Sequence, residues 1–217
     1  MRKFKVALFD LDGTLIDTEP QYSLFWSRIG RRYHPEIDGF QKIIKGMTLA
    51  SIFDKFFTDL KQRNLISSEL STFEDKMDYV YFEGVSNFIK DLRTNNIICA
   101  IVTSSNMNKI DSVRKKINNF EVFFDYIVTS EMFERSKPDP EPYLKAAQLA
   151  NASSDECIVF EDSLNGIMSA KNAGMFTIGI TTTNEVTKIK NLCDYTIDNY
   201  KELSFHKINF IINNLNI

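Results

Sequence analysis

The 217-residue sequence has few cysteines, few histidines and no long uninterrupted hydrophobic run. It contains three Cys, two His, five Pro and eight Gly. No stretch approaches the roughly 20 apolar residues of a transmembrane helix, and Asp10 interrupts the first apolar run too early for a signal peptide. The odd number of cysteines, two of them inside apolar runs, favours a reducing compartment. We therefore expect a cytoplasmic protein that does not bind membranes.

A strong excess of basic charge is missing as well. The 26 Lys and Arg residues face 29 Asp and Glu residues, which gives a net charge of -3. Basic residues with interleaved aromatics do not form the dense clusters that nucleic-acid grooves use, so we expect no nucleic-acid partner. The hydrophobic content of 43% and charged content of 25% are ordinary for a soluble globular protein. The length suffices for one ample core, with or without a smaller insert.

Short apolar runs alternate with helical patterns along most of the chain. The runs lie at 4–9, 97–102, 125–129, 157–160, 176–180 and 195–197. Helical patterns lie near 84–94, 106–118, 140–150, 163–173, 185–192 and 199–214. Continuous apolar strands separated by helices indicate a parallel sheet covered on both faces. The sequence predicts a doubly wound, mostly parallel, Rossmann-like α/β sheet.

The interval between the first two predicted strands breaks this alternation. Residues 18–82 carry Phe, Leu, Ile and Trp26 at helical spacing, with no convincing strand. We expect an inserted all-helical cap domain over 18–82, and a core domain formed by 1–17 and 83–217. The hinges should be short and lie near 16–20 and 81–85.

Polar residues follow several of the predicted strands. They are Asp10 and Asp12 after the first strand, Thr103 and Ser104 after the second, Lys137 in the loop before the fourth, and Glu161 and Asp162 after the fourth. Ligands of open α/β sheets bind beyond the carboxyl ends of the strands, where these side chains would meet. Taken singly, each stretch also fits a turn, a helix cap or a stiff loop. Together they predict a site for a divalent cation and a phosphate group.

Four segments carry a family resemblance. "FDLDGTLIDT", "IVTSSN", "SKPDPEPY" and "VFEDSLNGIMSAKNAGM" resemble the four ordered motifs of the haloacid dehalogenase-like hydrolase superfamily. The resemblance is strongest to its helical-cap subfamily of phosphatases and beta-phosphoglucomutase-like proteins. It covers the core from Phe4 to about Ile180, whereas the cap matches by position and helical character. It implies a phosphatase acting on a small phosphorylated metabolite, of the sugar phosphate, phosphoglycolate or nucleotide type.

The resemblance also implies the catalytic roles. Asp10 matches the nucleophile that forms an aspartyl-phosphate intermediate, and Asp12 matches the general acid/base. Gly13 would allow a sharp turn that aims Asp12 away from Asp10. Thr103 and Lys137 match the groups that hold the transferring phosphoryl oxygens.

By the same resemblance, the expected cofactor is Mg²⁺. Its ligands would be the carboxylates of Asp10 and Asp162 and the backbone carbonyl of Asp12, with Glu161 either a ligand or a partner of the ligands. A cation there would offset the clustered negative charge.

Further substrate contacts are expected near the catalytic motifs. The backbone amides of Leu11, Asp12 and Ser104 would donate to phosphate oxygens. Asn165, in the turn into the helix after the fourth motif, would also contact the substrate. We expect the small phosphorylated metabolite to be the only partner of a monomer or a weak homodimer.

The cap is expected to set the specificity. Phosphoglucomutases of the family carry a His and an Arg where this chain has Tyr22 and Leu49, so a phosphosugar mutase ranks behind a phosphatase. Three basic residues of the predicted cap, Arg28, Lys42 and Lys45, would bind the substrate or remain solvated.

Other activities of the superfamily stay open as alternatives. A phosphonate hydrolase would need a Schiff-base lysine from the cap, and a dehalogenase would not need an acid at Asp12. A non-catalytic, phosphate-binding regulatory protein can lose Asp12 or Lys137 without loss of fold. Because this chain keeps both residues, we expect an enzyme that hydrolyses phosphate esters.

Overall fold

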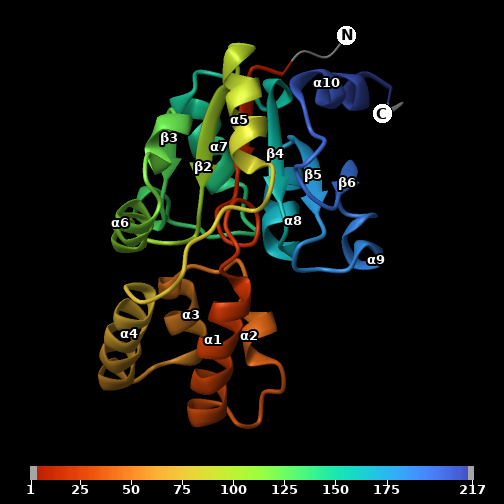
Figure 1. The fold of residues 1–217 in the computed structure, drawn as a ribbon. Helices are drawn as coiled ribbons and strands as arrows, with labels where there is room; N and C mark the ends of the chain where they lie inside the picture. The colour runs from red at the N-terminus through yellow and green to blue at the C-terminus, as the bar shows by residue number, and fades with distance from the viewer. Residues whose placement is uncertain (1–3, 215–217) are drawn as a thin grey trace.

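The computed structural model describes residues 4–214 and has two parts, a sheet flanked by helices and a smaller helical cluster (Figure 1). The six-stranded sheet has the order β3-β2-β1-β4-β5-β6, and every pairing is parallel. The strands are β1 (Val6–Phe9), β2 (Ile98–Val102), β3 (Tyr126–Val128), β4 (Cys157–Glu161), β5 (Phe176–Ile180) and β6 (Tyr195–Ile197). The predicted parallel Rossmann-like sheet is therefore confirmed.

Both faces of the sheet are covered, because successive residues of each strand point to opposite faces. In β1, Ala7 and Phe9 belong to one apolar core, while Val6 and Leu8 belong to another. The first core is closed by α5 (Val85–Thr94), α6 (Met107–Lys116) and α10 (Phe205–Asn214). The second is closed by α7 (Glu141–Leu149) and α8 (Leu164–Asn172).

The remaining elements of the core region are short. They are the 3₁₀ turns η1 (Phe120–Phe123), η2 (Ser130–Met132) and η3 (Ser154–Glu156), and the one-turn helix α9 (Val186–Ile189). The helices predicted over 185–192 and 199–214 are thus shorter than expected. The second begins only at Phe205 because the Asn199 side chain accepts a hydrogen bond from the Lys201 amide at 2.9 Å, which forms a turn instead.

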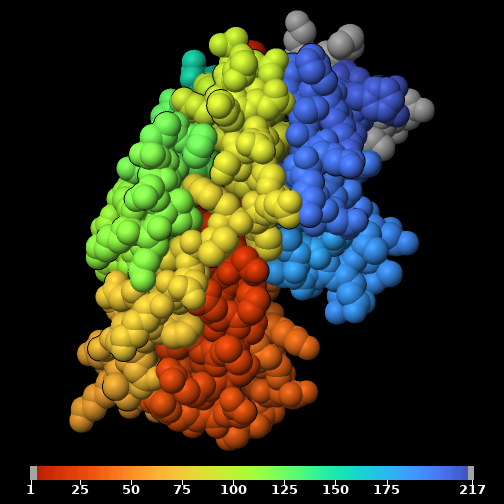
Figure 2. All heavy atoms as spheres, viewed as in Figure 1, coloured from red at the N-terminus to blue at the C-terminus, as the bar shows by residue number. Residues whose placement is uncertain are grey.

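The helical cluster lies beyond the carboxyl ends of the strands (Figures 1 and 2). It consists of α1 (Glu19–Tyr33), α2 (Phe40–Ile43), α3 (Leu49–Phe56) and α4 (Leu60–Glu74), and it has an apolar core of its own. The chain leaves and re-enters the sheet region at adjoining points, since Ile16 and Tyr81 form an antiparallel bridge. We refer to residues 18–82 as the cap. In the described part of the chain, no helix has the length and apolar character needed to cross a membrane.

Candidate active site

The chain turns sharply after β1, and the turn separates the first two carboxylates. Gly13 has a φ of +79°, and a Cβ atom there would lie 2.5 Å from Oδ2 of Asp162. Only glycine fits this position, because both the backbone angle and the lack of space exclude a side chain. As expected from the sequence, Asp10 and Asp12 therefore have different neighbours.

Asp10 is bound to a buried lysine. Nζ of Lys137 lies 2.6 Å from Oδ1 of Asp10, 2.7 Å from Oε1 of Glu161 and 3.1 Å from the carbonyl oxygen of Val102. These contacts use all three donors of an ammonium group that is only 1% exposed. Burial raises the pKa of Asp10, and Lys137 opposes that shift. Burial disfavours the charged lysine, but the carboxylates of Asp10 and Glu161 outweigh burial and raise the pKa of Lys137, which favours its charged form.

Glu161 is held on both of its oxygens. Oε1 accepts hydrogen bonds from Lys137 and from the Tyr143 hydroxyl at 3.1 Å. Oε2 accepts from the amide and hydroxyl of Ser163, at 2.8 and 3.0 Å. A Cβ at Gly166 would lie 1.7 Å from Oε1, so α8 approaches this carboxylate as closely as glycine allows. Glu161 thus orients Lys137.

Asp162 is fully buried and faces the cap. Its Oδ1 accepts from Thr14 at 2.9 Å, and its Oδ2 accepts from Thr183 and pairs with Lys45 of the cap at 3.0 Å. Burial raises the pKa of Asp162, and Lys45 opposes the shift. Lys45 also lies 3.3 Å from Glu19, whose pKa burial raises to about 7.

The residues present fit a hard divalent cation. One carboxylate oxygen from each of Asp10, Glu161 and Asp162 lies within 4.8 Å of the others. Clustered carboxylate oxygens are the ligands that Mg²⁺ and Ca²⁺ prefer. Each oxygen of Glu161 already accepts two hydrogen bonds, whereas Oδ1 of Asp162 accepts one, from Thr14, and Asp10 is bound through Oδ1 by Lys137. Asp10 and Asp162 are therefore the better placed ligands.

Asp12 is bound by a second buried lysine, Lys109 of α6. The lysine ammonium donates to Oδ1 of Asp12 and lies 4.3 Å from the centre of the Tyr22 ring, and its side chain is 1% exposed. Thr18 donates to the same oxygen, and Ser105 donates to Oδ2 at 3.1 Å. Asp12 therefore keeps an orientation of its own, away from Asp10.

The other predicted residues of the core lie around these carboxylates. Thr103 directly follows β2, is 1% exposed and accepts a hydrogen bond from the Ser105 amide at 3.0 Å. Ser104 donates to the Gly46 carbonyl at 2.8 Å, and Asn165 donates to the Lys45 carbonyl at 2.8 Å, so both contact the cap backbone. Leu11 has a fully buried side chain in the first apolar core.

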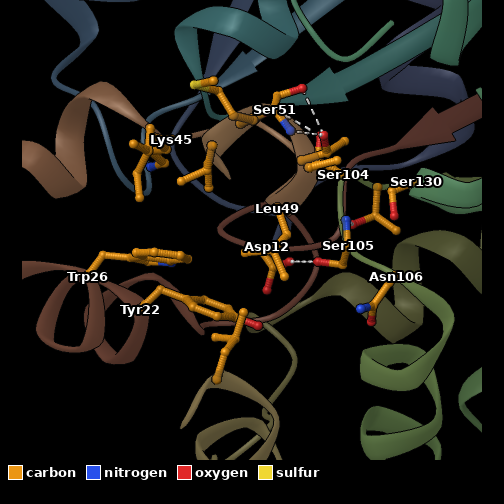
Figure 3. A pocket seen from close by; sticks show the side chains of 18 of the residues that line it. Asp12, Tyr22, Trp26, Lys45, Leu49, Ser51, Ser104, Ser105, Asn106 and Ser130 are labelled. Atoms are coloured by element: carbon orange, nitrogen blue, oxygen red, sulfur yellow. Dashed lines mark hydrogen bonds between the residues drawn. The ribbon is translucent and has the colours of Figure 1, made fainter. Parts of the chain in front are cut away.

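A cavity of about 570 Å³ lies between the cap and the carboxyl ends of the strands. Asp10, Asp12, Thr103 and Ser104 line it from the sheet side. From the cap side, Tyr22 and Trp26 project from α1, and Figure 3 shows their rings side by side in the pocket.

The three basic cap residues that the sequence predicts as substrate contacts have different environments in the structure. Lys45 lines the cavity. Arg28 is exposed, lies 3.4 Å from Glu69 and does not line the cavity, and the exposed Lys42 does not line it either. Of the three, only Lys45 is therefore placed to contact a substrate.

Two features of the site were missed by sequence reasoning. One is Lys109, and the other is the pair in which the Tyr22 hydroxyl donates to Oε1 of Glu74 at 2.7 Å. Of the two features, only Lys109 could have been suspected from the sequence, because it is a basic residue in the helix that follows the motif "VTSSN". This indication is weak, since lysines on helices are commonly solvated.

The chain is similar to known proteins along most of its length. The family described as haloacid dehalogenase-like hydrolase matches residues 7–180. Validoxylamine A 7'-phosphate phosphatase of Streptomyces hygroscopicus subsp. limoneus is 30% identical over 84% of this chain and 88% of its own length. Hexitol phosphatase A of Escherichia coli is 29% identical over 94% of both chains.

Solved structures of the family have the same fold. A HAD hydrolase of family IA, variant 3, from Entamoeba histolytica superimposes with a TM-score of 0.82 at 28% identity, covering 97% of this chain and 100% of its own. A beta-phosphoglucomutase from Clostridium difficile superimposes with a TM-score of 0.81 at 23% identity, and the superposition covers 97% of both chains. The chain belongs to the haloacid dehalogenase-like hydrolase family, and it is a phosphatase of that family.

Proposed function

We propose that this phosphatase is Mg²⁺-dependent and hydrolyses a small phosphorylated metabolite through an aspartyl-phosphate on Asp10. The observation that carries the proposal is Lys137, a buried cation held 2.6 Å from Asp10 by Glu161, with Asp162 beside them. The names of two relatives, validoxylamine A 7'-phosphate phosphatase and hexitol phosphatase A, support hydrolysis of a phosphate ester.

In the first step, a carboxylate oxygen of Asp10 forms a bond to phosphorus as the bond from phosphorus to the leaving oxygen breaks. Asp12 gives its proton to that oxygen, which leaves as an alcohol. The hydroxyl of Thr103 donates to a phosphoryl oxygen, and the positive charge of Lys137 beside Asp10 stabilises the negative charge that develops there. In the second step, Asp12 takes a proton from water as the water oxygen bonds to phosphorus, and the Asp10 carboxylate leaves.

Asp10, Asp162 and the backbone carbonyl of Asp12 would hold the metal ion. When bound, Mg²⁺ would offset the charge of these carboxylates and of the substrate phosphate.

Hydrolysis is favoured over phosphosugar mutation. Tyr22 and Leu49, which replace the His and Arg of the mutases, both line the cavity without a charge. A second phosphate would therefore find no cation at these two positions.

The test is a phosphate-release assay with p-nitrophenyl phosphate in the presence of Mg²⁺. We expect activity that EDTA abolishes and added Mg²⁺ restores, and that is lost in Asp10→Asn. Acid quenching during turnover, followed by mass spectrometry, should find a phosphorylated Asp10. Turnover in Asp10→Asn equal to wild type would refute the assignment, and activity that persists in EDTA would refute the metal requirement.

A further inference from the structure

On the cap side of the cavity, the described residues provide no free cation. Among the described residues that line the cavity, Lys45 is the only basic one. Its ammonium is already engaged, at 3.0 Å from Asp162 and 3.3 Å from Glu19. These two contacts place the lysine beside the sheet, at the catalytic end of the cavity, rather than deeper in the cap.

Two further cations near the cavity are paired with carboxylates. Lys109 pairs with Asp12. Arg63 lies 3.1 Å from Asp54 and also donates to the carbonyl oxygens of Phe53 and Phe57. Every one of these positive charges already has a carboxylate partner.

The cavity wall also carries four carboxylates beyond the catalytic centre, those of Asp54, Glu74, Glu131 and Glu134. Asp54 is paired with Arg63, and Asp54, Glu131 and Glu134 are exposed, so Glu74 is the one buried carboxylate of the four. Glu74 is the most buried of them, with 8% of its surface exposed, and it uses Oε1 to accept from the Tyr22 hydroxyl. A carboxylate can only accept hydrogen bonds when ionised, so this wall suits hydroxyl donors and repels anions.

The rest of the cap wall is aromatic and aliphatic. Trp26 and Tyr22 present their rings from α1 (Figure 3). Leu49, Ile52 and Phe53 of α3 line the cavity as well. Such rings pack against the C–H faces of a compact ligand, while the tyrosine hydroxyl and the glutamate bind its polar edges. This combination of flat apolar surface and hydrogen-bond acceptors matches a polyhydroxylated compound.

We infer that the substrate is a monophosphate ester whose remaining part is an uncharged polyhydroxylated group, and that a second phosphate or a carboxylate on that part is rejected. The inference rests on the proposed phosphatase function and narrows its substrate class. It favours sugar or polyol monophosphates over phosphoglycolate, nucleotides and sugar bisphosphates. Glu74 and Tyr22 are assigned as the residues that bind the hydroxyl groups.

The test uses matched substrate pairs. In the first pair, glycerol 3-phosphate has a hydroxymethyl group where 3-phosphoglycerate has a carboxylate. In the second pair, fructose 1,6-bisphosphate carries one phosphate more than fructose 6-phosphate. We expect kcat/KM to be at least about tenfold higher for the uncharged member of each pair, because unpaired like charges are excluded from such a wall. At a pH where Glu74 is ionised, Glu74→Gln should lower this ratio by about threefold or more, since it removes the carboxylate from the wall.

The control variant is Glu69→Gln, on the same helix α4 but paired with Arg28 and Arg32 outside the cavity, and it should leave the ratio unchanged. Because the ratio is formed within each variant, a partly unfolded preparation does not alter it. Equal or better use of 3-phosphoglycerate and the bisphosphate, with p-nitrophenyl phosphate still hydrolysed, would overturn this inference and leave the phosphatase assignment intact. No turnover of any ester, p-nitrophenyl phosphate included, would overturn both.

Discussion

At the scale of single residues, the site is organised by two buried lysines, one for each catalytic aspartate. Lys137 binds Asp10 and Lys109 binds Asp12, and each lysine side chain is 1% exposed. Burying an ammonium group costs free energy unless the group is paired and hydrogen-bonded, and the same holds for a buried carboxylate. Loss of either member of a pair would therefore destabilise the other. The two aspartates are thereby held apart in distinct orientations.

Replacing Lys109 with methionine should impair the acid function of Asp12 more than the attack by Asp10. We expect kcat for an alkyl phosphate to fall at least about tenfold further than kcat for p-nitrophenyl phosphate, whose leaving group departs without a proton. Steady-state kinetics on both esters measures the difference. Lys116→Met, at an exposed position of the same helix, is the control. Equal losses on the two esters would indicate a purely structural role for Lys109.

At the scale of elements, α1 and α4 are joined across the cap by the bond from Tyr22 to Glu74. The rings of Phe25 and Phe73 also join α1 and α4, with ring centres 5.1 Å apart and a tilt of 32° between them. Glu74 is the last residue of α4, so the helix end delivers a carboxylate to the cavity rather than to solvent. Burial raises the pKa of Glu74, with Lys109 opposing the shift.

The raised pKa of Glu74 predicts that the difference in unfolding free energy between wild type and Glu74→Gln depends on pH. The folded protein binds the Glu74 proton more tightly than the unfolded chain, whose glutamate pKa is about 4.3. The stabilising contribution is therefore complete below that pH and is lost as the pH rises through the raised value. Glu74→Gln cannot ionise, so its unfolding free energy relative to wild type should increase from pH 4.5 to pH 8. Urea unfolding across this range tests it, and a constant difference between the two proteins would contradict it.

At the scale of the whole molecule, the cap is held closed over the sheet by a few polar contacts. Lys45 reaches Asp162, and Asn165 and Ser104 bind the backbone of the segment that carries Lys45. The hydroxyls of Ser51 and Ser136 lie 2.8 Å apart at the same junction. Closure of this kind excludes water and brings cap residues to the substrate.

Loss of one such contact should weaken closure without unfolding the protein. Asn165→Ala removes the bond to the Lys45 carbonyl, and a single hydrogen bond is worth about 1 kcal/mol, so we expect kcat/KM to fall roughly fivefold. The melting temperature should change little, and small-angle X-ray scattering should show a more open average shape. Asn172→Ala, at an exposed position of the same helix bonded to the Pro138 carbonyl, is the control. Unchanged kinetics in Asn165→Ala would argue against a closing role for this contact.

Much of the fold was predictable because its signals are local. Continuous apolar strands and the helices between them predicted the parallel sheet, and the polar residues after the strands predicted which side chains would gather. Asp10, Thr103, Lys137, Glu161 and Asp162 meet because parallel strands end at one edge of the sheet. The late start of α10 was not predicted, since it depends on a side-chain turn at Asn199 that competes with the helix.

The sequence by itself determined the family, the sheet and the identity of the acidic and basic groups at the strand ends, because these follow from short-range patterns. Only the tertiary structure decided which cap residues face the cavity. Arg28, Lys42 and Lys45 are equivalent as sequence, yet Lys45 alone lines the pocket. Lys109 and Glu74 likewise acquire their roles from Asp12 and Tyr22, which lie 97 and 52 positions away along the chain. Contacts between segments so far apart depend on how the cap packs on the core, and no local pattern encodes that.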